Sequence, residues 1–144
     1  MSGAERLYTP ELLARTLSLA AFPFDENLPH AGAARSKSCG STLALRVALG
    51  GDGKIARLGL RVQACAVGQA SAAIFAEAAI GRTRNAIELA SREMRNWLAG
   101  EGPKPDWPGI ELLEPARSYP ARHGAIMLPW DAALAALSSG AASS

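Results

Sequence analysis

The stretch that decides the fold runs from Ser38 to Gly68 and reads SCGSTLALRVALGGDGKIARLGLRVQACAVG. Two runs in which apolar residues alternate with polar or small ones flank a glycine-rich segment in its middle. The apolar positions are Leu43, Leu45, Val47 and Leu49 in the first run and Leu58, Leu60 and Val62 in the second. Alternation with a period of two is typical of a strand with one buried face, so the stretch predicts a β-hairpin.

The pair Asp52-Gly53 lies between the two runs and predicts where the hairpin turns. Asp-Gly is favoured in two-residue type I′ turns, because both central residues of such a turn need a positive φ. A turn centred on this pair places apolar residues opposite one another across the two strands. The predicted pairs are Leu43 with Val62, Leu45 with Leu60 and Val47 with Leu58.

The two cysteines of the chain stand at the two ends of this stretch. Cys39 comes thirteen residues before Asp52, and Cys65 comes thirteen residues after it. Folding the chain at the turn brings both sulfurs to the same end of the hairpin, which predicts either a shared binding site or a disulfide. We expect neighbouring, reduced thiols, because the sequence begins without a signal-peptide pattern and disulfides are rare in the cytosol.

Composition limits the possible partners. A length of 144 residues predicts a single domain over 1–144, with flexible tails over 1–7 and 138–144. A net charge of +2, without a run of basic residues interleaved with aromatic ones, argues against a nucleic-acid partner. No apolar run is long enough to cross a bilayer, so we expect a cytoplasmic protein that has no membrane contact.

The remaining segments predict helices and a third strand. Gly32 to Lys37 is expected to form a short strand beside the hairpin. Pro129 is expected either to kink the last helix or to restart it, and the helical pattern runs from Trp130 to Leu137. The expected helices lie at 9–20, 70–80, 84–98 and 130–137. Strands first and helices after them predict an α+β domain, a three-stranded antiparallel sheet with helices packed on it.

The order of these features resembles a known family. A helix opened by Tyr8-Thr9-Pro10-Glu11 is followed by Cys39-Gly40 at the start of the hairpin and by Cys65 at its end. An alanine- and serine-rich helix comes next, and His123 leads into the final helix. This order resembles the NifU/IscU-like iron–sulfur cluster assembly scaffolds, from Tyr8 to Leu137. The resemblance implies a non-catalytic scaffold that receives sulfur from a cysteine desulfurase, builds a cluster on three cysteines and passes it to recipient apo-proteins.

The resemblance also implies a set of ligands. Cys39 and Cys65 match the first two cysteines of the family pattern. The third cysteine of the pattern follows a histidine, and this pair reads His123-Gly124 here, while the aspartate that follows Cys-Gly in the pattern is Ser41. The implied ligands are Cys39, Cys65 and His123. They suit an iron–sulfur cluster or iron, because histidine replaces cysteine in some clusters, and they suit zinc, which accepts both residue types.

Other interpretations of these residues stay open. Cysteine is among the most buried residue types, and His123 fits a hydrogen-bonded structural histidine as well as it fits a metal ligand. The chain is therefore either a divergent scaffold that binds metal or an interaction module that kept the fold and lost cluster assembly. A Cys–His enzyme is the weakest option, because the sequence shows no acidic partner for His123 and no oxyanion-hole motif.

Overall fold

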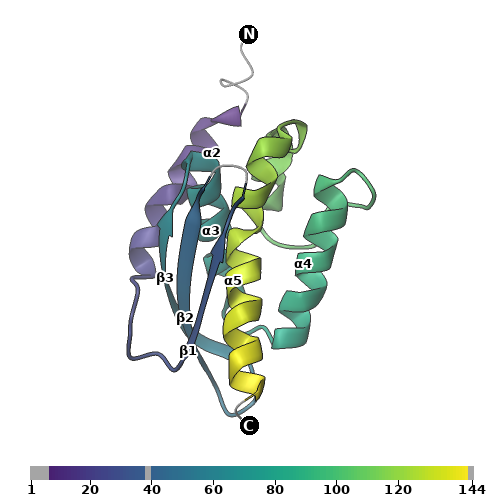
Figure 1. Cartoon of the computed structure of the whole chain (residues 1–144). Coiled ribbons are helices and arrows are strands. Elements are labelled where there is room, and N and C mark those ends of the chain that lie inside the picture. Colours follow the sequence, from purple (N-terminus) through teal and green to yellow (C-terminus); the bar gives the residue numbers. More distant parts are fainter. Residues whose placement is uncertain (1–6, 38–39, 143–144) are drawn as a thin grey trace.

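A three-stranded antiparallel sheet forms one layer of the molecule, and helices cover one of its faces (Figure 1). The structure is a computed structural model that describes residues 7–37 and 40–142. The strands are β1 (His30–Arg35), β2 (Thr42–Leu49) and β3 (Ile55–Gln63), in the spatial order β1-β2-β3. The predicted α+β class and the third strand are confirmed. Within the described residues, no helix is both long and apolar enough to cross a membrane.

The register of the β2–β3 hairpin is the predicted one. The pairs across the two strands are Leu43 with Val62, Leu45 with Leu60 and Val47 with Leu58. Leu43, Leu45 and Val47 are at most 1% exposed, so the alternation does mark the buried face of the sheet. The position of the turn in the sequence was therefore sufficient to predict which residues pair across the two strands.

The type of turn was predicted wrongly. The N–H of Gly50 donates to the carbonyl of Lys54 over 2.8 Å, and the N–H of Gly53 donates to the carbonyl of Gly50 over 3.0 Å. Within the segment from Gly50 to Lys54, only Gly53 has a positive φ, of +79°. This is a longer loop in which a left-handed glycine follows a tight turn. Asp52 therefore does not need a positive φ, and its Oδ1 accepts from the N–H of Lys54 over 3.0 Å.

Most predicted helices are present, with shifted bounds. The segment expected as one helix at 9–20 is a short α-helix followed by a 3-10 helix, and the helix expected at 70–80 begins directly after Cys65. Thr83 caps the helix expected at 84–98, since its Oγ1 accepts from the N–H of Ala86 over 3.2 Å. The helices before the last one are α2 (Pro10–Arg15), η1 (Thr16–Ala21), α3 (Ala66–Ala79), α4 (Arg84–Leu98), η2 (Ile110–Ser118) and η3 (Pro120–Arg122).

The last helix differs most from its prediction. Helix α5 covers His123–Ala142 and contains Pro129, whereas the sequence predicted a helix at 130–137 and a flexible tail at 138–144. Helix α5 thus runs to Ala142, into the segment predicted as a tail, and residues 1–6 and 143–144 lie outside the described part of the chain. Pro129 removes one backbone donor. The carbonyl of Ile126, close to the proline, accepts from the Ser71 hydroxyl over 2.6 Å, so packing supports the helix where the proline weakens it.

Helix α5 is the central element of the helical layer. It lies against β1 and β2, and it packs against α3 and α4 (Figure 1). Gly32 in β1 permits this approach, because a Cβ at that position would lie 2.1 Å from the carbonyl oxygen of Ala132. Trp130 of α5 is fully buried, with its ring 5.3 Å from those of Phe75 and Trp107. These contacts hold the middle of α5 against the sheet and α3, and the first residue of the helix is His123.

Candidate metal site

Three segments that are far apart in sequence converge at the end of the sheet opposite the hairpin turn. Thr42 pairs with Gln63 at the last step of the β2–β3 ladder, and Cys65 follows two residues later as the N-cap of α3. Gly68, in the first turn of α3, lies against the first turn of α5. A Cβ at Gly68 would lie 3.3 Å from the Cβ of Ala125. Cys65 and His123 therefore start two helices that touch at the same end of the molecule.

Cys65 is half-buried, and its thiol is free. It makes no side-chain hydrogen bond to the start of α3, although its carbonyl accepts from the N–H of Gln69 over 2.9 Å. The sulfur is thus not used for helix capping. A thiol in this position has the accessibility that a metal ligand needs.

His123 is half-buried, and a hydrogen bond orients its ring. Its Nε2 lies 2.9 Å from the carbonyl oxygen of Arg117. A carbonyl oxygen only accepts hydrogen bonds, so Nε2 carries the proton and, in the neutral ring, Nδ1 keeps the lone pair. Histidine ligands of metals are commonly held in this way, with the other ring nitrogen donating to a carbonyl or carboxylate. The structural role and the ligand role of His123, alternatives at the level of sequence, are therefore compatible.

Arg117 is a site residue that sequence reasoning missed. Its Nε donates to the carbonyl of Trp97 over 3.1 Å, and its guanidinium carbon lies 5.0 Å from the centre of the Trp97 ring. The side chain anchors the segment whose backbone carbonyl holds His123. The acceptor is a backbone atom, which every residue type provides, so no sequence motif could have pointed to it.

The other predicted positions are only partly placed. Cys39 lies outside the described residues, so its distance from Cys65 stays a prediction. Ser41 is buried, and its carbonyl accepts from the N–H of Ser36 over 2.8 Å. Within the described residues, no group of three or more His, Cys, Asp or Glu side chains is placed to hold a metal ion. Of the predicted ligands, Cys65 and His123 lie at the starts of two helices that pack against each other.

A groove of about 510 Å³ opens beside His123 and Gly124. It lies between the end of β1, the C-terminal end of α4 and the first turns of α5. Buried Leu98 and Met127 form apolar parts of its lining. Its charged lining residues are Arg35, Lys37, Arg95 and Asp131.

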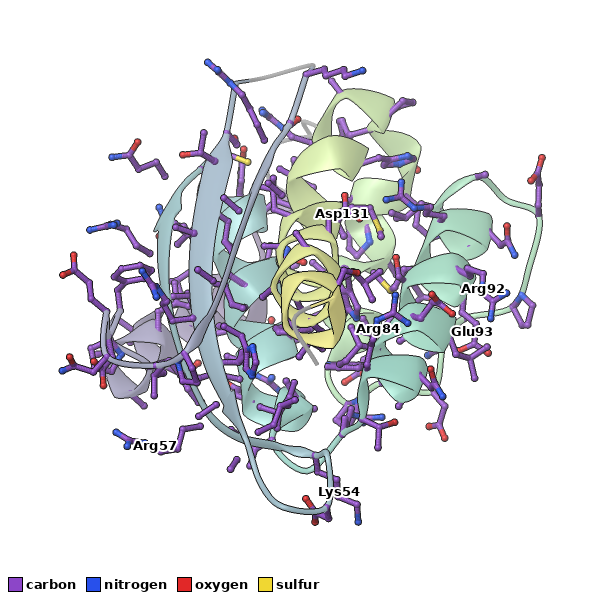
Figure 2. All side chains as sticks on the ribbon, turned by 60° about the horizontal axis from the view of Figure 1, so that its bottom comes forward. Lys54, Arg57, Arg84, Arg92, Glu93 and Asp131 are labelled. Atoms are coloured by element: carbon purple, nitrogen blue, oxygen red, sulfur yellow. The ribbon has the colours of Figure 1, made fainter. Side chains whose placement is uncertain are left out.

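Asp131 and Arg95 form an ion pair in this groove. The Nη2 of Arg95 lies 2.5 Å from the Oδ1 of Asp131, which sits between α5 and α4 (Figure 2). Burial raises the pKa of the Asp131 carboxyl above its ordinary value, although the charge and the hydrogen bond of Arg95 act in the opposite direction. No local pattern of residues indicates this pair, because its members are 36 positions apart in the chain.

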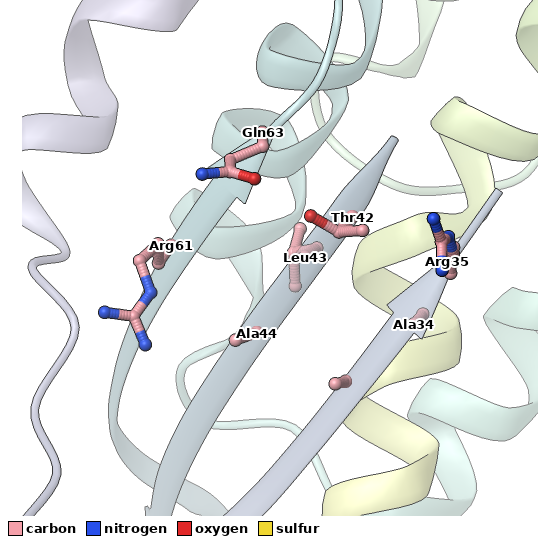
Figure 3. Close-up of a pocket in the computed structure, with 8 residues that line it drawn as sticks. Ala34, Arg35, Thr42, Leu43, Ala44, Arg61 and Gln63 are labelled. Carbon is pink, nitrogen blue, oxygen red and sulfur yellow. The ribbon is translucent and has the colours of Figure 1, made fainter. Parts of the chain in front are cut away.

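A second hollow, of about 410 Å³, lies at the same end of the sheet on strand residues (Figure 3). Thr42 and Gln63 line it at the paired ends of β2 and β3, together with small residues such as Ala34 and Ala44. None of the predicted ligands lines this hollow. The groove beside His123 is therefore the better candidate for a functional site.

Comparison with solved structures shows which known proteins share this fold. A crystal structure of a nitrogen-fixing NifU-like protein (N-terminal) from Brucella abortus aligns with a TM-score of 0.88 and 27% sequence identity. The alignment covers 99% of this chain and 100% of that one. The chain therefore has the fold of this NifU-like protein, and the comparison supports the family resemblance of its sequence. No family model matches it, and no curated protein does.

A second neighbour shares the NifU/IscU-like fold. It is described as an iron–sulfur cluster assembly scaffold protein for the SUF system of the thermophile Fervidobacterium islandicum. It aligns with a TM-score of 0.81 and 23% identity, over 91% of this chain and 96% of that one.

Proposed function

We propose that this NifU/IscU-like chain is a divergent iron–sulfur cluster assembly scaffold, with Cys39, Cys65 and His123 as its ligands. The observation that carries the proposal is the hydrogen bond of His123 Nε2 to the Arg117 carbonyl. It leaves Nδ1 as the nitrogen with a lone pair, at the end of the molecule where Cys65 starts α3. The Brucella neighbour, alike over its whole length, supports the same role.

Two thiolates and one imidazole form a weaker cluster site than three thiolates do. An iron–sulfur cluster prefers sulfur ligands, so this ligand set should hold a cluster loosely and lose it readily to oxygen or to an acceptor. Zinc tolerates mixed sulfur and nitrogen ligands with a water in the fourth place, so we expect it to bind more tightly than a cluster. The cluster is cargo in this proposal, and the chain performs no catalytic step.

The resemblance supplies the partners of the proposed scaffold. A cysteine desulfurase donates the sulfur, and recipient apo-proteins accept the finished cluster. We place this exchange in the cytoplasm, where thiols stay reduced.

Anaerobic reconstitution with iron and sulfide, or with zinc, tests the ligand set. Wild type, Gly124→Cys, Cys65→Ser and His123→Ala are compared by visible absorbance and metal analysis. Gly124→Cys should bind more cluster than wild type, because it restores the third sulfur of the family pattern. Cys65→Ser should lose most of its metal, because two remaining ligands rarely suffice.

The control for His123→Ala is His30→Ala, which removes the other histidine of the chain at the start of β1. This variant should keep its metal. Equal and negligible metal in all the proteins would contradict the ligand proposal, and the interaction module on the same fold would then be the better description.

A further inference from the structure

The face of the sheet opposite the helical layer carries small apolar residues where polar ones are expected. When one face of an antiparallel sheet is in water, its outward positions are normally polar. Here Ala31 and Ala33 of β1 lie on the outward face and are exposed. They pair with Arg46 and Ala44 of β2, which are outward and half-buried. The middle of this face is therefore a floor of alanines.

Two adjoining hollows follow this floor. Their volumes are about 410 and 350 Å³, and Ala33 and Ala44 line both. In the first hollow, Arg61 of β3 and Arg35 of β1 lie on either side of Ala44 (Figure 3). Phe24 lines the second hollow. Together the two hollows form a trough that runs along β2.

The charge of the trough is positive. The three strands contain no Asp or Glu, and their arginines are Arg35, Arg46, Arg57 and Arg61. Of these arginines, only Arg57 has an acidic partner within 7–37 and 40–142, and this partner is Asp25 at 3.7 Å. The remaining cations favour a ligand that carries carboxylates.

Two of these arginines are held by the protein itself. The guanidinium carbon of Arg61 lies 4.3 Å from the centre of the Phe24 ring. The Nη1 of Arg46 donates to the carbonyl of Leu28 over 3.1 Å. A ring and a neutral carbonyl leave the guanidinium charge uncompensated. Because both side chains are already restrained, they lose less conformational entropy when a carboxylate binds.

The trough favours a helix over an extended segment. An extended segment laid on the face of a sheet leaves its backbone N–H and C=O groups unpaired, whereas a helix pairs them internally. Strands β1 and β3 are two strand spacings apart, about 10 Å, which is close to the diameter of a helix. From Thr42 to Arg46 the trough is about 13 Å long, enough for about nine helical residues.

We propose that this face of the sheet docks an amphipathic helix of a protein partner, with an apolar stripe against the alanines and carboxylates on its flanks. Arg46 and Arg61 bind the carboxylates, and the small side chains of Ala33 and Ala44 admit the stripe. The inference goes beyond the proposed function, because it needs no metal and none of the proposed ligands.

The first experiment titrates the metal-free protein with a synthetic helix. The probe is a fluorescent peptide of about 18 residues, with leucine and alanine on one face and glutamates on both flanks, and a second probe carries lysines in place of the glutamates. Anisotropy at low salt should show binding of the glutamate peptide alone, weakened by added salt. Arg46→Gln/Arg61→Gln should weaken this binding about tenfold. The matched control, Lys54→Gln/Arg92→Gln, removes two cations at the hairpin turn and on α4 and should bind like wild type (Figure 2).

The second experiment tests the alanine floor without changing charge. Ala44 is outward on β2, so Ala44→Gln should unfold in urea as wild type does. The larger side chain should occupy the middle of the trough and weaken binding of the glutamate peptide about tenfold. In NMR spectra of wild type, the peptide should shift the amide signals of residues 31–35 and 42–46 and leave those of the hairpin turn unchanged.

Several outcomes would overturn the inference. They are a glutamate peptide that fails to bind, equal binding of the two peptides, and equal binding by wild type and the two trough variants. Amide shifts confined to the groove beside His123 would also overturn it. Sedimentation equilibrium of the protein alone tests the other occupant, because a dimer that Ala44→Gln abolishes would assign the face to a second copy of the chain. The scaffold proposal survives each of these results, since its own test measures bound metal.

Discussion

The hairpin turn between β2 and β3 is a local structure, whereas the opposite end of the sheet is assembled from segments far apart in sequence. The hydrogen bonds that close the turn lie between Gly50 and Lys54, and Lys54 also forms a β-bridge with Thr83. At the other end, Cys65 and His123 come together because α3 and α5 pack against each other at Gly68. The turn should therefore tolerate change with local consequences, while the candidate site depends on how α5 is seated.

Two glycines, Gly32 and Gly68, allow α5 to pack closely against β1 and α3. Gly32 lets β1 approach the middle of α5, and Gly68 lets α3 approach its first turn. Substitutions of these glycines should disturb the candidate site at the starts of α3 and α5 without altering any proposed ligand. Changes at the turn should not reach the site.

Gly32→Ala should have the largest effect. The added Cβ would lie 2.1 Å from the Ala132 carbonyl oxygen and 2.5 Å from the Ala136 nitrogen, both backbone atoms of α5. Strand and helix must move apart, so we expect a loss of about 3 kcal/mol or more in the free energy of unfolding, measured in urea. Gly51→Ala at the turn, where a Cβ meets nothing within 4 Å, is the control and should change stability by under about 0.5 kcal/mol. Similar losses of stability in the two variants would contradict the expected difference between the β1–α5 contact and the turn.

Gly68→Ala should affect both stability and metal binding. The new Cβ would lie 2.6 Å from the Cβ of Ala64 and 3.3 Å from that of Ala125. Separation of the two helix starts should cost about 2 kcal/mol of stability. It should also weaken zinc binding about tenfold in a competition titration, because Cys65 and His123 no longer share one geometry. Unchanged zinc affinity would show that the site does not depend on this contact.

Gly53→Ala tests whether a change in the β2–β3 turn affects the candidate site. This glycine has a φ of +79°, which costs a residue with a Cβ about 1 kcal/mol. Urea unfolding should show that loss, and the zinc affinity of the folded protein should equal that of wild type. A drop in affinity as large as that of Gly68→Ala would mean that the two ends are coupled.

Arg117→Met tests how His123 is held. Methionine keeps much of the apolar side chain and loses the hydrogen bond to the Trp97 carbonyl, worth about 1 kcal/mol. We expect nitrogen NMR of the metal-free protein to show a less uniform His123 tautomer, and zinc to bind more weakly. Arg92→Met, on the exposed face of α4, is the control and should leave both unchanged. An unaltered tautomer in Arg117→Met would show that the carbonyl needs no such anchor.

Asp131→Asn should have the smallest effect and is visible in the pH dependence of stability. Burial raises the pKa of Asp131, so the folded state binds this proton more tightly than the unfolded state does. The stability gained in this way is fully present below the ordinary carboxyl pKa and is lost as pH rises through the raised value. Urea unfolding across the acidic range should show this decline for wild type, and the asparagine variant should lack it.

Asp52→Asn at the turn is the matched control for Asp131→Asn. It retains the side-chain oxygen that accepts from the N–H of Lys54. Its stability should follow wild type across the same pH range. If Asp131→Asn also follows wild type, the raised pKa of Asp131 is refuted.

The sequence alone was sufficient where short-range rules govern the chain. The β2–β3 register follows from alternation about one turn, and the predicted pair of Leu45 with Leu60 is present. The bounds of α4 follow from a cap at Thr83 and a regular apolar stripe. A strand pattern and a helix cap act over a few residues, so they can be recognised without knowing the rest of the fold.

Tertiary structure decided what depends on distant partners. Pro129 predicted a kink or a restart of the last helix, yet α5 continues through it, because packing on the sheet and on α3 outweighs one lost hydrogen bond. The family resemblance pointed to His123, but only the packed fold places its Nε2 on the Arg117 carbonyl. Such contacts form between residues separated by whole elements, and no local pattern in the sequence encodes them.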